Sequence, residues 1–153
     1  MIKHLIKNSY NDIFNKLYDI TEGNIILGGS AALKIESITD RIPNDLDVML
    51  TNSNWLKYRF EIEKKFRIHP TIKRTIFDGL EYDSYTCFDK ETKLNEFHLF
   101  VHYDENISKT INGIQIINTD IILKAKRMLC KVEQDFQKHL NDIKLIENFL
   151  NEK

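Results

Sequence analysis

Apolar residues recur along the chain at two spacings, one typical of helices and one of strands. Apolar residues at helical spacing from Tyr10 to Tyr18 follow a capping pair, Ser9 and Asp12, and predict a first helix. Asp78-Gly79 is a typical hairpin turn between two strand-like stretches. The predicted order is a helix after Ser9, a strand at 24–27, a short helix at 31–36, a strand at 45–50, a helix opened by Ser53 or Asn54, strand-like stretches at 67–76, 81–88, 96–103 and 113–117, a helix capped by Thr119 and a last helix from about Glu133.

This order of elements predicts an α+β fold close to the α/β class, in which helices flank a mixed β-sheet and a pair of helices follows the last strand. No repeat, low-complexity tract or Pro/Gly-rich linker divides the 153 residues, so we expect a single domain over residues 1–153. The aromatic residues of the predicted strands have core-like spacing, and we interpret them as packing residues rather than as a base-stacking surface: Tyr82, Tyr85, Phe88 and Phe97.

The charge and the cysteine content argue against some classes of protein. A formal net charge of −1 gives no electrostatic basis for nonspecific binding to nucleic acid, and the basic residues between Lys64 and Arg74 are interpreted as a solvated face. Two cysteines, Cys87 and Cys130, do not make a disulfide framework or a metal-spaced pair. The absence of a long apolar span and of a secretory segment predicts a cytoplasmic location.

The strongest chemical signal is a glycine turn followed by two alternating carboxylates. Gly28-Gly29-Ser30 comes directly after an apolar run and directly before a helical pattern, so its backbone can approach a phosphate closely. Asp45 and Asp47 lie two residues apart in an apolar stretch, so we expect both side chains on the same face of one strand. Together these features predict a site for Mg²⁺ and a nucleoside triphosphate.

This pair of motifs resembles the nucleotidyltransferase superfamily, which has the fold of DNA polymerase β, and in particular its minimal bacterial members of the abortive-infection and toxin type. Their signature is an apolar strand, a Gly-Gly/Ser-Ser turn, a short helix and a strand that bears Asp-x-Asp. Arg41, four residues before Asp45, also fits the second motif. Residues 119–127 and 138–143 resemble the two closing helices of the family, the second through its Lys138-x-x-x-Asp142 pattern.

The resemblance implies an enzyme that moves a nucleoside monophosphate from an NTP to a hydroxyl of RNA, a protein or a small molecule. It implies that Asp45 and Asp47 are catalytic and hold Mg²⁺. It further implies that an NTP is bound by Gly28, Gly29, Ser30, Arg41 and Lys126. Lys124 is the alternative to Lys126 if the helix register differs, and Lys138 and Asp142, one helical turn apart, could pair with each other. A toxin-type relative would act beside an antitoxin partner.

One position departs from the family pattern. A third carboxylate is expected on a later central strand, but the matching stretch of residues 95–101 carries His98 there. We expect His98 to lie beside Asp45 and Asp47, where two carboxylates would raise its pKa. Its role is left open among a base, a metal ligand and a hydrogen-bonded sheet histidine, and Glu96 is the alternative third acid if the register shifts.

Two functions therefore follow from the sequence. The first is a Mg²⁺-dependent nucleotidyltransferase in which Asp45, Asp47 and His98 are the catalytic residues. The alternative is a catalytically impaired domain of the same fold that binds a nucleotide or a partner protein. The intact Gly28–Ser30 turn and the Asp45-x-Asp47 pair favour the first, and His98 favours the second.

Overall fold

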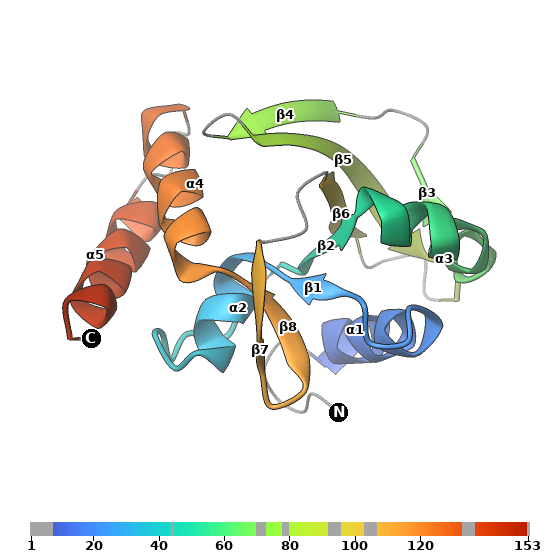
Figure 1. Ribbon diagram of the computed structural model, residues 1–153, viewed down its shortest axis with the longest axis horizontal. Coiled ribbons are helices and arrows are strands. Elements are labelled where there is room, and N and C mark those ends of the chain that lie inside the picture. Colours follow the sequence, from blue (N-terminus) through green and yellow to red (C-terminus); the bar gives the residue numbers. More distant parts are fainter. Residues whose placement is uncertain are drawn as a thin grey trace.

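The computed structural model describes residues 8–43, 45–69, 73–77, 80–91, 96–102, 107–132 and 137–152. Five helices and eight strands follow one another in the described part of the chain (Figure 1). The elements are α1 (Asn8–Ile20), β1 (Ile26–Leu27), α2 (Gly29–Ile35), β2 (Asp47–Thr51), α3 (Asn52–Lys65), β3 (Phe66–Ile68), β4 (Lys73–Phe77), β5 (Leu80–Asp89), β6 (Glu96–His102), β7 (Ser108–Ile111), β8 (Ile114–Ile117), α4 (Thr119–Val132) and α5 (Gln137–Asn151).

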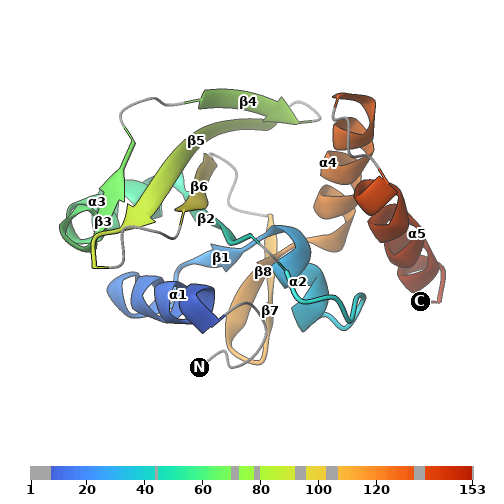
Figure 2. The same cartoon turned by 180° about the vertical axis from the view of Figure 1, so that it is seen from behind.

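The strands form one mixed sheet in the order β3-β5-β6-β2-β1-β8-β7, and β4 pairs with β5 outside this path. Strand β2 pairs in parallel with β6 and antiparallel with β1, while β1 pairs in parallel with β8. Helices α4 and α5 pack on each other at one side of the molecule, away from α1 and α3, in both views of the ribbon (Figures 1 and 2). The predicted α+β fold with a mixed sheet and a C-terminal helical pair is confirmed.

Alternation of apolar residues explains the central strands. Val48 and Leu50 of β2 and Leu99 and Val101 of β6 are fully buried, because residues two apart share one face of a strand. Phe97, at the start of β6, packs edge-on against Phe66 with 5.2 Å between the ring centroids. Among the predicted packing residues, Tyr82, Tyr85 and Phe97 are indeed buried.

Several predicted boundaries were wrong by a few residues. The residue that caps α3 is Thr51, whose side chain accepts a hydrogen bond from the Asn54 backbone, rather than Ser53 or Asn54. The predicted strand at 67–76 is two strands, β3 and β4, on the same neighbour β5. The Asp78-Gly79 turn and the expected helix start at Glu133 lie outside the described residues, although β4 and β5 pair antiparallel as the turn predicts.

Strand β7 was missed, although the sequence carries its signal. Asn112-Gly113 joins β7 to β8, both residues have positive φ (50° and 81°), and Ile111 and Ile114 face each other across the turn. Asn-Gly between two apolar residues is a strong hairpin signal because both turn positions need positive φ. The two isoleucines that flank Asn112-Gly113, Ile111 and Ile114, are the feature from which the β7–β8 hairpin could have been predicted.

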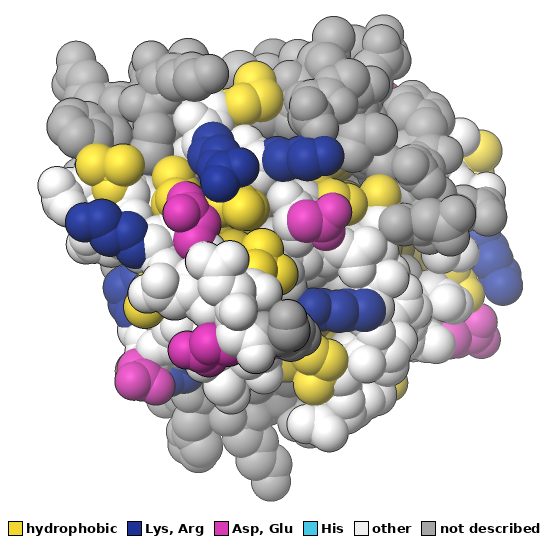
Figure 3. All heavy atoms as spheres, turned by 60° about the vertical axis from the view of Figure 1, so that its left-hand side comes forward, with side chains coloured by type: hydrophobic (Ala, Val, Ile, Leu, Met, Phe, Trp, Pro, Cys, Tyr) yellow, Lys and Arg dark blue, Asp and Glu magenta, His cyan; other side chains and the backbone are white. Residues whose placement is uncertain are grey.

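The structure describes the length and polarity of the helices, one of the two cysteines and part of the surface charge. No helix in the described ranges is long and apolar enough to cross a bilayer. Cys87 is a free, buried cysteine, and burial raises the pKa of its thiol to about 12. On the face that includes the C-terminal helical pair, basic and acidic side chains are interspersed (Figure 3). The Lys64, Lys65 and Arg67 side chains are exposed, as a solvated face requires.

Phe97→Ala should lower the free energy of unfolding by about 3–5 kcal/mol, because a fully buried ring leaves a cavity. Phe60→Ala is the matched control: this phenylalanine is 74% exposed, and its removal should change stability by no more than about 0.5 kcal/mol. Urea denaturation measures both values. Equal losses for the two variants would contradict the described packing.

Candidate functional site

The site begins with the parallel pairing of β2 and β6. The first residue of β2, Asp47, is in register with His98 of β6, so their side chains lie next to each other on one face of the sheet. The His98 Nδ1 atom lies 3.5 Å from Asp47 Oδ1, and its Nε2 atom lies 3.4 Å from Glu96 Oε1. His98 therefore lies beside Asp47 on an adjacent strand, as expected, and its imidazole bridges two carboxylates.

The surroundings of His98 raise its pKa above the ordinary value. The hydrogen bond with Asp47 is the main cause, and the charges of Asp47, Glu96 and Asp45 add to the rise, while burial opposes it. The expected direction of this shift is confirmed.

Asp45 does not lie in a strand as predicted: it is exposed and precedes β2, which begins at Asp47. The charge of Asp45 nevertheless raises the pKa of His98, so Asp45 and Asp47 both affect the same histidine.

Tyr10 of α1 reaches the same region, which the sequence did not suggest. Its hydroxyl donates a hydrogen bond to the Glu96 carbonyl oxygen at 3.0 Å. Burial raises the pKa of Tyr10 first, and the charges of Asp45, Glu96 and Asp47 raise it further. Tyr10 thus attaches α1 to the first residue of β6 and fixes the end of the strand that carries Glu96.

The glycine turn lies directly against Asp47. The Gly28 backbone N–H donates to the Asp47 carbonyl oxygen at 2.9 Å. Gly29 has a φ of 57°, and a Cβ atom placed on it would come within 2.7 Å of Asp47 Oδ2. Only glycine fits here, because both the backbone angle and the approach of the carboxylate exclude a side chain. The Gly29 backbone therefore packs directly against the Asp47 carboxylate.

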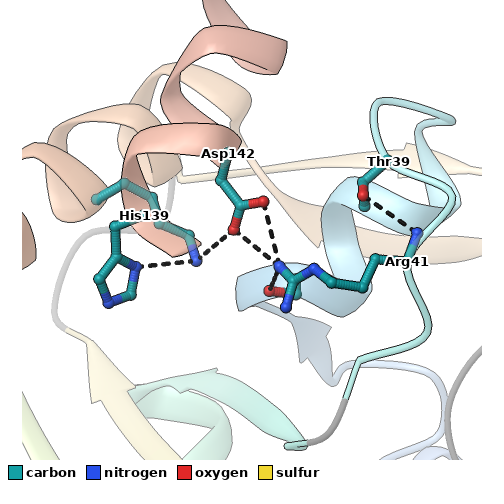
Figure 4. A network of polar contacts seen from close by, with 6 residues as sticks. Thr39, Arg41, His139 and Asp142 are labelled. Atoms are coloured by element: carbon teal, nitrogen blue, oxygen red, sulfur yellow. Dashed lines mark hydrogen bonds and ion pairs between the residues drawn. The ribbon is translucent and has the colours of Figure 1, made fainter. Parts of the chain in front are cut away.

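Beyond the turn, a polar network connects α2 to the C-terminal helical pair (Figure 4). The Arg41 guanidinium donates to Ser30 Oγ at 3.1 Å and to both carboxylate oxygens of Asp142, at 3.1 and 2.9 Å. The Lys126 ammonium of α4 lies 2.9 Å from the same carboxylate and 3.5 Å from His139 Nδ1. Three of the residues with an implied nucleotide-binding role, Ser30, Arg41 and Lys126, are therefore in one network.

The network bears on the expected partners of Asp142 and on the choice between Lys126 and Lys124. Asp142 pairs with Arg41 and Lys126, because the α5 face that bears Asp142 is turned toward α2 and α4. The Lys138 side chain lies outside the described residues, so its pairing with Asp142 stays a prediction. Lys126 is 6% exposed and faces this network, whereas Lys124 is exposed, so the helix register favours Lys126. Spacing within one helix identified Asp142 but not its partners, which are distant in sequence.

The aspartates fit a divalent cation. Carboxylate oxygens are the ligands that Mg²⁺ prefers, and proteins commonly hold it through one or two carboxylates while substrate phosphates complete the shell. Asp45 and Asp47 are such carboxylates, and both lie close enough to His98 for their charges to raise its pKa. Within the described ranges no three His, Cys, Asp or Glu residues are arranged to hold a metal without other ligands. The protein groups thus fit a cation that shares its ligands with a bound nucleotide.

Structural comparison assigns the fold. A candidate nucleotidyltransferase from Thermotoga maritima superposes on the chain with a TM-score of 0.59, 11% identity and coverage of 98% of both chains. The Megavirus polyadenylate synthase gives a TM-score of 0.50 at 10% identity, and the match covers 95% of this chain and 38% of the viral one. JHP933 from Helicobacter pylori gives a TM-score of only 0.45 at 17% identity, with 90% of this chain covered and 66% of the other. The chain thus spans slightly less than two thirds of the Helicobacter chain.

The protein therefore has the nucleotidyltransferase fold, and the resemblance inferred from the two sequence motifs is confirmed at this level. No model of a known protein family matches the sequence, and no curated protein matches it either.

Asp47→Asn should lower the pKa of His98, because it removes the hydrogen bond and the charge that raise it most. Glu96→Gln should lower it less, since Glu96 contributes a smaller charge effect. The His98 pKa is raised in the folded state, so its stabilisation is complete below the ordinary value of 6.5 and is lost as pH rises through the raised value. NMR titration of the imidazole measures the pKa; a larger effect of Glu96→Gln would contradict the assignment.

Asp142→Asn should lower the free energy of unfolding by about 3 kcal/mol, because it leaves the buried Lys126 and the half-buried Arg41 without their carboxylate. Glu147→Gln, on the same helix, removes the partner of Arg127 from a pair whose members are both about half exposed, and should cost less than about 1 kcal/mol. Chemical denaturation of both variants compares them; similar values would show that the Asp142 network contributes no more than a surface pair.

Proposed function

We propose that the protein is a metal-dependent nucleotidyltransferase that moves a nucleoside monophosphate from an NTP to a hydroxyl acceptor. The observation that carries the proposal is a continuous series of contacts. Asp47 meets the Gly29 turn, the next residue Ser30 contacts Arg41, and Arg41 shares Asp142 with Lys126. A carboxylate that can bind a cation thus lies next to hydroxyl and cationic groups that can bind phosphates.

In this proposal the acceptor oxygen bonds to the α-phosphorus as the bond from that phosphorus to the α,β-bridging oxygen breaks. Pyrophosphate leaves, and the proton of the acceptor hydroxyl passes to the solvent. A divalent cation held by Asp45 and Asp47 would neutralise charge on the triphosphate. Ser30, Arg41 and Lys126 would orient the β- and γ-phosphates, with the backbone of Gly28 and Gly29 close to them. Such transfer depends mainly on positioning and electrostatics, so few residues are needed.

The acceptor class follows only from the family resemblance. RNA, a protein or a small molecule supplies the hydroxyl, and a toxin-type enzyme would also have an antitoxin partner in the cytoplasm. The interspersed charges in Figure 3 offer no single basic field on that face among the described residues. We therefore expect an acceptor held by specific contacts rather than by charge alone.

The second candidate function is a domain that binds a nucleotide without transferring it. The observation that favours it is His98, which occupies the strand position next to Asp47 where the family pattern calls for a carboxylate. Mg²⁺ prefers oxygen ligands, so a histidine at this place weakens a metal-assisted reaction. His98→Asp should then raise transfer above that of the wild type.

The test incubates the full chain with Mg²⁺, each of the four α-³²P-labelled NTPs, and total RNA or protein extract, and follows label in the acceptor. Asp47→Asn should reduce transfer about 100-fold or more, because loss of a metal ligand removes several kcal/mol of charge stabilisation. Asp19→Asn, which changes an exposed carboxylate of α1, is the control and should transfer like the wild type. If the wild type binds a nucleotide but transfers no label, and only His98→Asp transfers it, the second function is supported instead.

Gly29→Ala and Gly113→Ala form a matched pair, since both glycines have positive φ and only Gly29 adjoins Asp47. Each should lose about 1–3 kcal/mol of stability from the backbone strain. Only Gly29→Ala should also weaken binding of Mg²⁺ with an NTP, because its Cβ displaces the Asp47 carboxylate. Calorimetric titration separates the two effects; unchanged affinity in Gly29→Ala would contradict the proposed cation site.

A further inference from the structure

We propose that the outer face of α3 joins two copies of this chain, with the two helices antiparallel and a two-fold axis at Phe60. This face has Leu56 and Phe60 at its centre, and its charged residues are Lys57, Arg59, Glu61, Glu63 and Lys64. The inference concerns a surface on which the transfer reaction does not depend.

The centre of the outer face of α3 is apolar. Phe60 is 74% exposed and Leu56 is 67% exposed, which is more than any other large apolar side chain in the described part of the chain. They lie one helical turn apart on the side of α3 that points away from the core, which the same helix contacts through Trp55, Tyr58 and Ile62. Neighbouring exposed apolar side chains of this size mark a contact with another chain.

The charges at the two edges of this face indicate what covers it. Helical spacing places Arg59 and Glu63 along one edge and Lys57 and Glu61 along the other. On each edge the base comes first and the acid follows one turn later, so an antiparallel copy brings each base to the acid of the same edge. The acids also pair within α3, Glu63 with Arg59 at 2.8 Å and Glu61 with Lys64 at 3.0 Å.

The same charges define the position of the two-fold axis. The pair on one edge is centred one residue after Phe60, and the pair on the other edge is centred one residue before it. An axis at Phe60 therefore leaves each base within about 3 Å, measured along the helix, of the acid that it meets. Such a contact uses the same surface of both copies and closes after two of them.

This axis also brings the apolar side chains of the two copies together. It places one Phe60 ring against the other, and Leu56 against the aliphatic stem of Lys64 of the second copy. Lys64 already lies over the ring of its own Phe60, with 5.5 Å between the ammonium nitrogen and the ring centroid. Exposed ion pairs contribute little to affinity, so the apolar contact supplies most of the binding and the charges set its direction.

The proposed contact leaves the candidate site open. Trp55 of α3 packs on Tyr85 of β5 with 5.1 Å between the ring centroids. Tyr85 is in register with Leu99, whereas His98 is the next residue of β6 and faces the other side of the sheet. Helix α3 also lies at the end of the molecule away from α4 and α5 (Figures 1 and 2). A second copy on α3 therefore covers neither His98 nor the residues proposed to bind phosphates.

The dimer should be weak, because the contact is limited to one face of a helix of 14 residues. Association also stabilises the folded chain by mass action. The small effect on stability expected for Phe60→Ala therefore applies to dilute protein, below the Kd of the dimer, where the chain is monomeric. Above that concentration, the wild type should gain stability that Phe60→Ala does not gain.

Sedimentation equilibrium of the full chain from about 1 to about 200 µM, a range suited to a weak interface, tests the proposal. The wild type should pass from monomer to dimer over this range. Phe60→Gln should raise the Kd at least about 10-fold, because both copies lose a central aromatic residue. Leu145→Gln, which changes a leucine of α5 that is 41% exposed, is the matched control and should leave the Kd unchanged.

Charge reversal tests the antiparallel arrangement. One variant carries Lys57→Glu and Arg59→Glu, and the other carries Glu61→Lys and Glu63→Lys. Each variant alone should remain monomeric, because like charges then meet at both edges, whereas an equimolar mixture should form a dimer of one copy of each. Circular dichroism verifies that both variants are folded.

Three outcomes would overturn this inference and leave the proposed transfer reaction standing. The first is a wild type that stays monomeric throughout the range, in which case another protein or none covers α3. The second is a dimer whose Kd is the same in Phe60→Gln, which would place the contact elsewhere. The third is a mixture of the charge-reversed variants that stays monomeric while the wild type dimerises.

Discussion

The candidate site depends on one buried carboxylate, that of Asp142. A charged group that is removed from water is tolerated only if opposite charges and hydrogen bonds replace the lost solvation. Asp142 receives both, from Arg41 after α2 and from Lys126 of α4. The same contacts keep two cationic side chains near the glycine turn. The C-terminal helical pair is thereby connected to the glycine turn, which lies against Asp47 at the start of the central strand β2.

The charges in the site are divided between its two halves. On the sheet side, Asp45, Asp47 and Glu96 surround a single histidine, and the negative charge there suits a metal ion. On the helix side, two cations share one carboxylate, and the remaining positive charge suits phosphate oxygens. A nucleoside triphosphate with its metal ion carries both kinds of group. The fold alone does not determine such a division, because a fold supports many functions and the side chains of the site decide among them.

The parts of the site that could be predicted are those set by local sequence. Gly28-Gly29 and Asp47 were recognisable because a sharp turn and a strand start each leave a pattern in neighbouring residues. Asp45 was placed wrongly because apolar alternation does not fix where a strand begins, and its boundary depends on the register with β6. The partners of Asp142 and the role of Tyr10 could not be predicted, since these contacts join residues 101 and 86 positions apart. Only tertiary packing determines such pairs.

The position of β1 in the sheet has a consequence for how the chain folds. This strand of only two residues lies between β2, which follows it closely in sequence, and β8, which aligns Gln115 with Ile26. Parallel pairing across so long a segment is slow to form, because the entropy of closing the loop is lost before the new contacts compensate for it. On the ribosome, β1 can pair with β2 early, but its parallel pairing with β8 forms only after β8 has been synthesised. Arg41 and Lys126 then acquire their shared carboxylate only when α5 emerges. We therefore expect the region proposed to bind the nucleotide to complete its contacts after the strands β5 and β6 have paired.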